Sequence, residues 1–396
     1  SVLINLGMLA YFKYTNLFIQ IANDLAGHDV LAFRNIFLPV GISFFVFQSM
    51  SYTIDIYRRQ LTPLTCWLDY FFYLSFFPQL VAGPIVRARD FIPQIRQNPL
   101  RVTREMFGRG LFLIMTGLVK KAVISDYISV NFVDRVFDNP MLYSGFENLM
   151  GVYGYALQIY CDFSGYSDMA IGIALLLGFR FPKNFDSPYK SATITEFWRR
   201  WHISLSTWLK DYLYISLGGN RKGRFRTYVN LVVTMLLGGL WHGAAPRFVL
   251  WGGFHGLLLA LHKFLMRLFP RMKATGADMK RRWRIAGIFV TFHLVCLGWI
   301  FFRARDVGTG ADILEQVFTN FDISLIPNII TGYWEIFAMM LVGYVAHFTP
   351  RRLQERACDA VIRNPLAVNA LLIVVIIWVV MQVKSADIQP FIYFQF

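Results

Sequence analysis

Apolar stretches of about twenty residues recur along this chain of 396 residues, and they restrict its fold more than any other feature. A helix that crosses a bilayer needs about 20 mostly apolar residues. Only 16% of the residues are charged, whereas soluble globular proteins average about 25%. The sequence therefore predicts an all-α polytopic membrane protein with one transmembrane domain over residues 1–396. The predicted spans are 1–23, 36–56, 107–124, 148–180 (broken), 228–243, 247–266, 285–302, 332–349 and 365–384.

The loops between these spans differ in their content of Lys and Arg. The rich loops are 57–65, 87–106, 181–200, 219–227, 267–284 and 351–364. The poor ones are 24–35, 125–147, 306–331 and the tail 385–396. Rich and poor loops alternate, as expected when the basic loops stay on the cytoplasmic side. The net charge of +15 is explained by these loops, so nucleic acid is not an expected partner.

One apolar segment, 66–86, lies between two basic loops and so is not expected to cross the membrane fully. Pro78 and the pair Gly83-Pro84 would interrupt a helix there. Irregular backbone at membrane depth is tolerated only inside protein or beside a cavity. The segment is predicted to form a re-entrant hairpin.

The segment 193–217, TITEFWRRWHISLSTWLKDYLYISL, places apolar residues at helical spacing along one face. Thr193 and Glu196 match the capping box that begins many helices. A helix rich in Trp and Arg, flanked by cytoplasmic loops, is predicted to lie at the membrane interface.

His242 ends the apolar run LVVTMLLGGLWHG with glycines on both sides. An ionisable residue at membrane depth is costly and marks a functional site by default. An imidazole is also the best general base at neutral pH. The residues alone leave two interpretations open, a catalytic base or a structural histidine held between helices or at the headgroups.

The other histidines carry weaker signals. His255, on the next helix, either orients His242 or packs glycine-faced helices. His202 lies on the flank of the amphipathic stripe and faces either the bundle interior or the headgroups. His293 is interpreted as structural, and His347 as a residue at a span boundary.

Asp162 and Asp168 lie within the apolar stretch 160–179. Buried carboxylates must be paired or must line a polar cavity. These two either orient a histidine or a donor group, or have a purely structural role. The four cysteines are far apart, and neither a metal motif nor a phosphate loop is present, so no metal is expected.

Several stretches together resemble the membrane-bound O-acyltransferase (MBOAT) family, in its branch that acetylates bacterial polysaccharides. They run through most of the chain in the family's order. The stretches are LPVGISFFVFQSMSYTIDIYR (38–58), FFPQLVAGPIVR (76–87), DFSGYSDMAIG (162–172), FRFPKNFDSPY (179–189), TEFWRRWHISLSTWLKDYLYISLGGNR (195–221) and LLGGLWHGA (236–244), with a family-like tail, PFIYFQF (390–396).

The resemblance implies a fold and two site residues. The fold is a ring of tilted helices around a thinned centre, where a cytoplasmic tunnel and an outer funnel meet. The family's invariant histidine corresponds to His242, and its second polar site to His202. Members of the family also carry further helices before the point where this chain starts, so N-terminal spans are expected to be missing from this numbering.

The predicted function is therefore that of an O-acetyltransferase in the bacterial inner membrane. It would move an acetyl group from a cytosolic thioester donor, acetyl-CoA, toward an exported polysaccharide such as alginate or cellulose. His242 would act as general base or transient acyl carrier, and His202 would position donor or acceptor. The resemblance implies a separate periplasmic acetyltransferase of the SGNH-hydrolase type as partner. The alternatives are a polysaccharide or lipid-carrier transporter and a non-catalytic scaffold.

Overall fold

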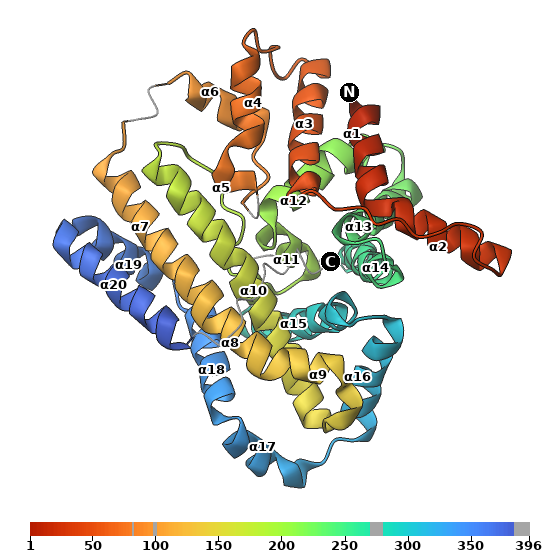
Figure 1. Cartoon of the computed structure of the whole chain (residues 1–396). Helices are drawn as coiled ribbons and strands as arrows, with labels where there is room; N and C mark the ends of the chain where they lie inside the picture. Colours follow the sequence, from red (N-terminus) through yellow and green to blue (C-terminus); the bar gives the residue numbers. More distant parts are fainter. Residues whose placement is uncertain (81–82, 98–100, 270–279, 384–396) are drawn as a thin grey trace.

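The computed structural model describes residues 1–80, 83–97, 101–269 and 280–383 (Figure 1). The described residues form helices joined by loops, and none of them lies in a β-strand. This confirms the predicted all-α class. In chain order the α-helices are α1 (Val2–Leu9), α2 (Thr15–Ala26), α3 (Ile42–Tyr57), α4 (Trp67–Ser75), α5 (Phe77–Leu80), α6 (Ala88–Ile95), α7 (Arg104–Leu118), α8 (Asp126–Ile128), α9 (Asp134–Asp138), α10 (Gly145–Leu176), α11 (Ile194–Arg200), α12 (Ile203–Trp208), α13 (Arg224–His242), α14 (Pro246–Leu268), α15 (Arg281–Arg303), α16 (Val307–Thr319), α17 (Ile326–Gly332), α18 (Trp334–Phe348), α19 (Arg351–Arg363) and α20 (Leu366–Val383).

Short segments of other helix types extend several of these helices. Because π-helical turns are often found at functional sites, their positions are relevant to the candidate site. The π-helical segments are Ala10–Tyr14, Val119–Ser125, Ser129–Val133 and Leu209–Tyr214, and the 3₁₀ segments are Pro140–Leu142, Pro188–Lys190 and Ile323–Leu325.

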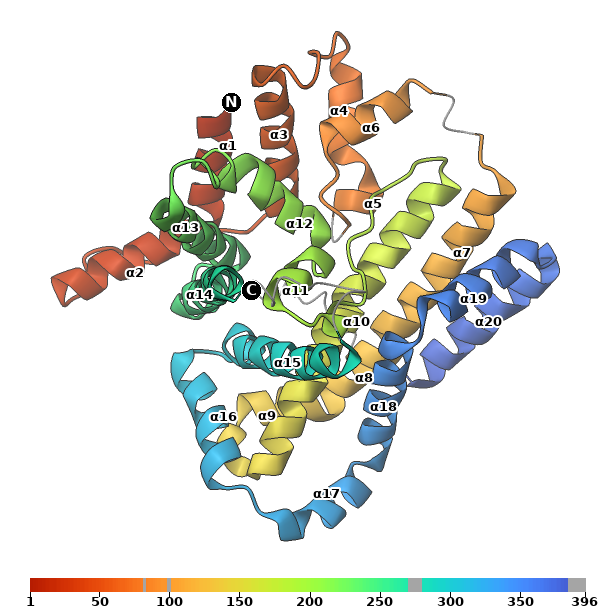
Figure 2. The same cartoon turned by 180° about the vertical axis from the view of Figure 1, so that it is seen from behind.

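The short helices α11 and α12 lie at the centre of the molecule, with longer helices around them (Figures 1 and 2). Helices α7 and α10 run side by side on one flank, and α19 packs against α7. Helices α13 and α14 form a second side-by-side pair, which contacts the centre through α11. This arrangement places loops and short helices inside a surround of longer helices.

Within the described ranges, four helical segments are long and apolar enough to cross a membrane. They are Val2–Ala26, Pro246–Leu268, Arg281–Arg303 and Leu366–Val383. A fifth candidate consists of two parts, Ile323–Gly332 and Trp334–Phe348, which meet at an angle of 87°. The remaining predicted spans correspond to α3, α7, α10 and α13, which are shorter or more polar. The chain is thus a multi-pass membrane protein.

Helix α10 corrects the predicted broken span, because it runs without interruption over 32 residues. Gly165 does not break it, since the glycine is used for close packing on α7. A Cβ atom on Gly165 would lie 2.8 Å from the Gly117 carbonyl oxygen, and one on Gly172 would lie 2.6 Å from that of Gly110. Small residues at such contacts let membrane helices approach closely. The fold uses two glycine pairs, seven residues apart on each helix, to bring α7 and α10 together.

The segment 66–86 is interrupted as predicted. Helices α4 and α5 are separated by Phe76, which has extended backbone, and the chain then turns back so that α6 contacts α4 (Figure 1). The chain that returns after this turn is bound to α12, because the Ile85 N–H donates to the Ser204 Oγ at 3.0 Å. The turned-back segment is therefore buried against protein along its second half.

The segment 193–217 is not one continuous helix, contrary to the prediction. It divides into α11 and α12 at His202, whose backbone is left-handed with φ of 42°. The predicted start is confirmed, since the Thr193 hydroxyl accepts the Glu196 N–H at 3.1 Å. The Glu196 carboxylate accepts the N–H of Ala192 at 2.9 Å, one residue before the expected cap position. Local periodicity thus predicted the helical faces but not the break between them.

The predicted loop 306–331 is largely helical, comprising α16, Ile323–Leu325 and most of α17. It contains no Lys or Arg. The absence of basic residues still predicts that this segment faces the periplasm, because basic residues resist translocation.

We expect Ser324→Cys to be labelled from outside intact cells and Thr275→Cys to be labelled only after permeabilisation. Ser324 is exposed, and Thr275, which lies outside the described residues, belongs to the basic 267–284 loop. The measurement is labelling with a membrane-impermeant maleimide, in a background lacking the four native cysteines. Labelling of position 275 in intact cells would contradict the whole orientation.

Candidate active site

His242 is the last residue of α13, and glycines allow α13 and α14 to pack closely beside it. A Cβ atom on Gly239 would lie 2.2 Å from the Phe248 carbonyl oxygen, and one on Gly252 would lie 2.3 Å from that of Met235. No side chain fits at either position. These glycines therefore serve close helix packing, which holds the two helices in a fixed register around His242.

The end of α13 is bound by a residue far away in the sequence. Lys13 donates to the Trp241 carbonyl at 2.5 Å and to the His242 carbonyl at 3.0 Å, and the Tyr14 hydroxyl donates to the Leu240 carbonyl at 2.7 Å. Both donors lie in the π-helical segment Ala10–Tyr14. The last carbonyls of a helix lack partners within it, and a cation there is favourable. Sequence reasoning missed this contact, and only the interruption of an apolar run by a lysine pointed to it.

The imidazole of His242 is enclosed by aromatic rings and is only 5% exposed. Ring centroids of Trp241, Trp251 and Phe302 lie 5.0, 5.1 and 5.2 Å from that of His242. The rings come from α13, α14 and α15. This surround excludes bulk water and restricts the orientation of the imidazole.

His202 is fully buried at the break between α11 and α12. Its Nδ1 lies 3.2 Å from Oδ1 of Asn184, which also accepts the Ser204 hydroxyl at 2.9 Å. For Nδ1 to donate to this oxygen it must carry the ring proton, which makes Nε2 the acceptor nitrogen of the ring. A strained, non-glycine backbone conformation held by such contacts is typical of functional sites. The fold thus fixes both the position and the tautomer of His202.

The structure brings the two predicted site residues together around one indole ring. Trp241 lies next to His242 in the sequence, and its ring centroid is 6.3 Å from that of His202. The ring of Phe163 on α10 lies 4.6 Å from His202 on another side. Residues 40 positions apart in the sequence therefore share one buried aromatic environment.

The carboxylates of Asp162 and Asp168 are paired with lysines of the π-helical segment after α7. Asp162 lies 2.5 Å from Lys121, which also contacts Asp126 at 2.7 Å. Asp168 lies 2.5 Å from Lys120. Pairing compensates the cost of burying these charges. The requirement that the carboxylates be paired or line a polar cavity is met by pairing.

The remaining histidines differ in their surroundings. His293 contacts the Tyr153 hydroxyl at 2.8 Å and the Phe289 carbonyl at 2.8 Å, which supports a structural role. His347 lies in the last turn of α18, at the end of a predicted span as expected, but it is buried, and its Nε2 accepts the Tyr189 N–H at 3.2 Å. His255 is fully buried on α14.

A cavity of about 1000 Å³ lies where three of the predicted basic loops meet. Its walls come from the end of α14, the start of α13 and the helix α11. Five basic side chains line it, and the two acidic ones are Asp186 and Glu196. The basic residues are Arg199, Arg200, Arg224, Lys263 and Arg267. The cavity is positively charged and lies on the side predicted to be cytoplasmic.

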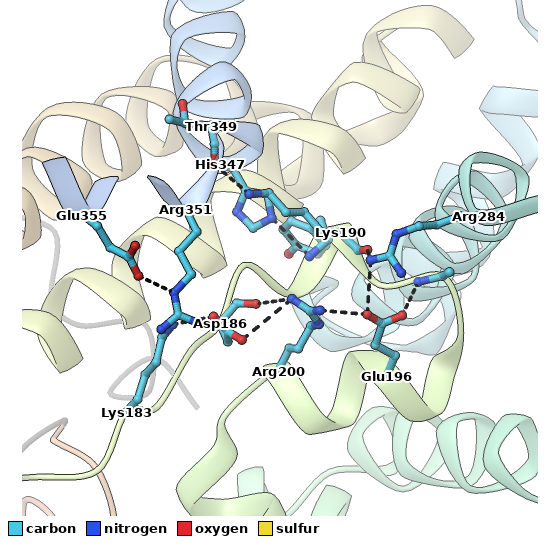
Figure 3. Close-up of polar contacts among 12 residues, drawn as sticks. Lys183, Asp186, Lys190, Glu196, Arg200, Arg284, His347, Thr349, Arg351 and Glu355 are labelled. Atoms are coloured by element: carbon cyan, nitrogen blue, oxygen red, sulfur yellow. Dashed lines mark hydrogen bonds and ion pairs between the residues drawn. The ribbon is translucent and has the colours of Figure 1, made fainter. Parts of the chain in front are cut away.

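Both acidic residues of the cavity are already engaged with cations (Figure 3). Arg200 contacts Glu196 at 2.9 Å and donates to the Asp186 carbonyl at 3.1 Å. Asp186 also pairs with Lys183. Burial acts to raise the pKa of Asp186, but the hydrogen bond and charge of Lys183, with the charge of Arg200, outweigh it and hold the pKa below its ordinary value. The carboxyl therefore stays ionised.

The positive charges of the other basic side chains in the cavity are not neutralised by ion pairs within the described ranges. Arg199, Arg224 and Arg267 form no ion pair with any residue in the described ranges. Lys263 donates to the Asn220 side-chain oxygen at 2.7 Å, which is uncharged. A cavity with this balance is suited to a polyanionic ligand.

The chain is similar to known proteins over most of its length. The model of the membrane-bound O-acyltransferase family matches residues 61–304, which include both candidate histidines. The probable alginate O-acetylase AlgI of Pseudomonas putida is 38% identical over 99% of this chain and 83% of its own length. That of Pseudomonas aeruginosa is 43% identical over 81% of this chain and 59% of its own length.

Relatives with other substrates are also similar. The peptidoglycan O-acetyltransferase of Helicobacter pylori is 38% identical over 78% of this chain and 62% of its own length. The chain spans about three fifths of the length of several of these relatives. The match confirms the predicted acyltransferase class. On its sequence, its helical architecture and these similarities, the chain belongs to the membrane-bound O-acyltransferase family.

Proposed function

We propose that this chain takes an acetyl group from acetyl-CoA on the cytoplasmic side and passes it across the inner membrane for O-acetylation of an exported polysaccharide. The observation that carries the proposal is the position of His242, a buried imidazole at the end of α13, next to an indole, Trp241, that also faces the second buried imidazole, His202. The relatives named above as O-acetylases and O-acetyltransferases support the chemistry.

His242 serves as the general base in this proposal. The acceptor hydroxyl loses its proton to the imidazole as its oxygen attacks the thioester carbonyl carbon. A C–O bond forms, the C–S bond breaks, and the imidazolium returns the proton to the leaving thiolate. A placed base typically contributes about 10²–10⁴-fold to such a rate. In a variant of this mechanism the imidazole carries the acetyl group transiently.

His202 positions the reacting groups. Because Nδ1 of His202 donates to Asn184, Nε2 is the ring nitrogen that accepts a hydrogen bond. A hydroxyl held by this nitrogen keeps a lone pair available for attack. Ser204 donates its backbone N–H and its hydroxyl to the same Asn184 oxygen, which holds the Asn184 side chain in place. The orientation of the His202 ring is therefore set before substrate binds.

The basic cavity suggests where the donor enters. Coenzyme A carries several phosphate charges at the end opposite its thioester, and Arg and Lys are the usual partners of phosphates. The cavity lies on the predicted cytoplasmic side, and its wall helix α14 leads toward His242. This placement favours a charged donor from the cytosol over a neutral lipid donor.

A partner completes the reaction on the polymer in this proposal. The acetyl group would then pass to a separate periplasmic transferase of the SGNH-hydrolase type. The outer mouth near residues 244–247, together with the 306–331 segment, is the proposed docking surface. Phe318 and Ile323 expose large apolar side chains on that segment.

We expect the purified protein to cleave acetyl-CoA slowly and to leave polysaccharide unmodified until the periplasmic partner is added. The reason is that the chain provides the base and the donor site but not a polymer site. The measurements are release of free thiol and acetyl content of the polymer. Addition of the partner should raise thiol release and polymer acetylation together.

The same experiment distinguishes the alternatives. A transporter without acyl chemistry would release no thiol with or without the partner. Efficient polymer acetylation by the isolated membrane protein would contradict the need for a partner. Arg224→Gln is a useful variant, because loss of one unpaired cavity charge should raise the KM for acetyl-CoA without changing protein level.

A further inference from the structure

Three neighbouring rings between the basic cavity and His242 contain buried nitrogens without hydrogen-bond partners among the described residues. They are the indole nitrogens of Trp198 and Trp251 and both ring nitrogens of His255. Buried polar groups are nearly always paired, and an indole N–H normally finds an acceptor. Four such atoms in one cluster indicate that something outside the described residues normally binds there.

The three rings touch one another. The centroid of His255 lies 5.2 Å from that of Trp198 and 4.9 Å from that of Trp251, and the two indoles are 5.7 Å apart. His255 is fully buried, and Trp251 is 2% exposed. The unpaired nitrogens therefore form one continuous polar patch within an otherwise aromatic region.

A neighbouring tryptophan in the same cluster is paired. The indole N–H of Trp299, whose ring stacks on Trp251 at 5.9 Å, donates to the Tyr189 hydroxyl at 3.2 Å. The fold is thus able to supply an acceptor in this region. It has done so for Trp299 and not for the three rings of the patch.

Helix α15 packs closely against the imidazole of His255. A Cβ atom on Gly298 of α15 would lie 2.8 Å from the Nε2 of His255. Only glycine at this position lets α15 pack so closely against the imidazole. The ring of His255 is therefore held in place by the backbone of α15.

The patch lies on the way from the basic cavity to His242. His262 lines the cavity and lies seven residues after His255 on the same face of α14. Trp198 adjoins Arg199 and follows Thr195 by three residues, and both of these line the cavity. At the other end, Trp251 contacts the ring of His242. From His262 to Trp251 the helix rises by about 16 Å, which a ligand arm must bridge.

We propose that Trp198, Trp251 and His255 form the binding site for the amide-bearing arm of the thioester donor. The proposal rests on the proposed function, since it concerns the donor of that reaction. The arm of coenzyme A holds two secondary amides, each with one carbonyl acceptor and one N–H donor. The two indoles and the imidazole together offer three N–H donors and one acceptor, enough to pair both amide carbonyls and one of the two amide N–H groups. His255 is thus a substrate-positioning residue, separate from the chemistry at His242.

The test compares two acetyl thioesters that differ in the arm. Acetyl-pantetheine carries both amides, and S-butyl thioacetate carries none. We expect His255→Phe and Trp198→Phe each to lower kcat/KM for acetyl-pantetheine about 5- to 10-fold, the range for one lost hydrogen bond. Cleavage of S-butyl thioacetate should change less than about twofold. His255→Gln, which keeps one donor and one acceptor, should restore most of the difference between the donors.

The matched control is Trp299→Phe, a change of the same type in the same cluster at an indole that already has a partner. It should affect both thioesters equally. An equal fall for both thioesters in the His255 and Trp198 variants would mean a structural role and would overturn the proposal. Unchanged kinetics would mean that only water fills the patch, which also overturns it. If the unaltered protein cleaves neither acetyl-CoA nor acetyl-pantetheine, the proposed function itself fails, and the arm site fails with it.

Discussion

Replacing His242 by alanine is expected to abolish acetylation of the exported polymer, while protein level and polymer yield stay near normal. The imidazole is the buried base of the proposed reaction, and loss of a placed base lowers a rate by about 10²–10⁴-fold. The side chain lies at the end of α13, so its removal leaves the glycine contacts of the helix unchanged. The measurement is the acetyl content of polymer from cells that carry the variant.

Two further variants are compared with the His242 variant. His202→Ala should impair acetylation severely but incompletely, because its proposed role is positioning and Asn184 and Ser204 remain in place. His293→Ala is the control, because that ring contacts Tyr153, Phe289 and Phe292, and most activity should remain. Near-normal acetylation by the His242 variant would contradict its assignment as the base.

Gly239→Ala is expected to prevent normal accumulation of the folded protein. The added methyl group would lie 2.2 Å from the backbone oxygen of Phe248. Helices α13 and α14 would have to move apart, and overpacking of this kind typically costs about 1–3 kcal/mol, occasionally more. The measurements are the monodisperse fraction on size-exclusion chromatography in mild detergent and the temperature of unfolding.

Gly253→Ala is the matched control on the partner helix. Its methyl group would meet only the end of the Leu236 side chain, at 3.3 Å, which is able to shift. Because Ala is favoured over Gly in a helix by roughly 1 kcal/mol, this variant should be neutral or slightly more stable. Equal stability of the two variants would show that the close contact at Gly239 does not hold the helix pair.

The sequence by itself was sufficient for the class of fold, and it supplied two candidate site residues. Long apolar runs with few charges predict membrane helices because the bilayer leaves no other solution for the backbone. The family motifs pointed to His242 and His202. The start of α11 at Thr193 also followed from local residue types. The basic loops around 181–200, 219–227 and 267–284 were placed on one side of the membrane by charge alone, and residues from all three line one cavity.

Tertiary structure alone decided how the site is assembled. The left-handed break at His202 cannot be inferred from helical periodicity, because it is stabilised by Asn184, 18 residues earlier in the chain. The contact of Lys13 with the end of α13 joins residues 228 and 229 positions apart. The continuity of α10 depends on the backbone of α7. Periodicity and capping report only what a segment does with its near neighbours, whereas the pairing of a buried polar group depends on which distant segment reaches it. For the same reason, the unpaired nitrogens of Trp198, Trp251 and His255 became visible only once all their neighbours were placed.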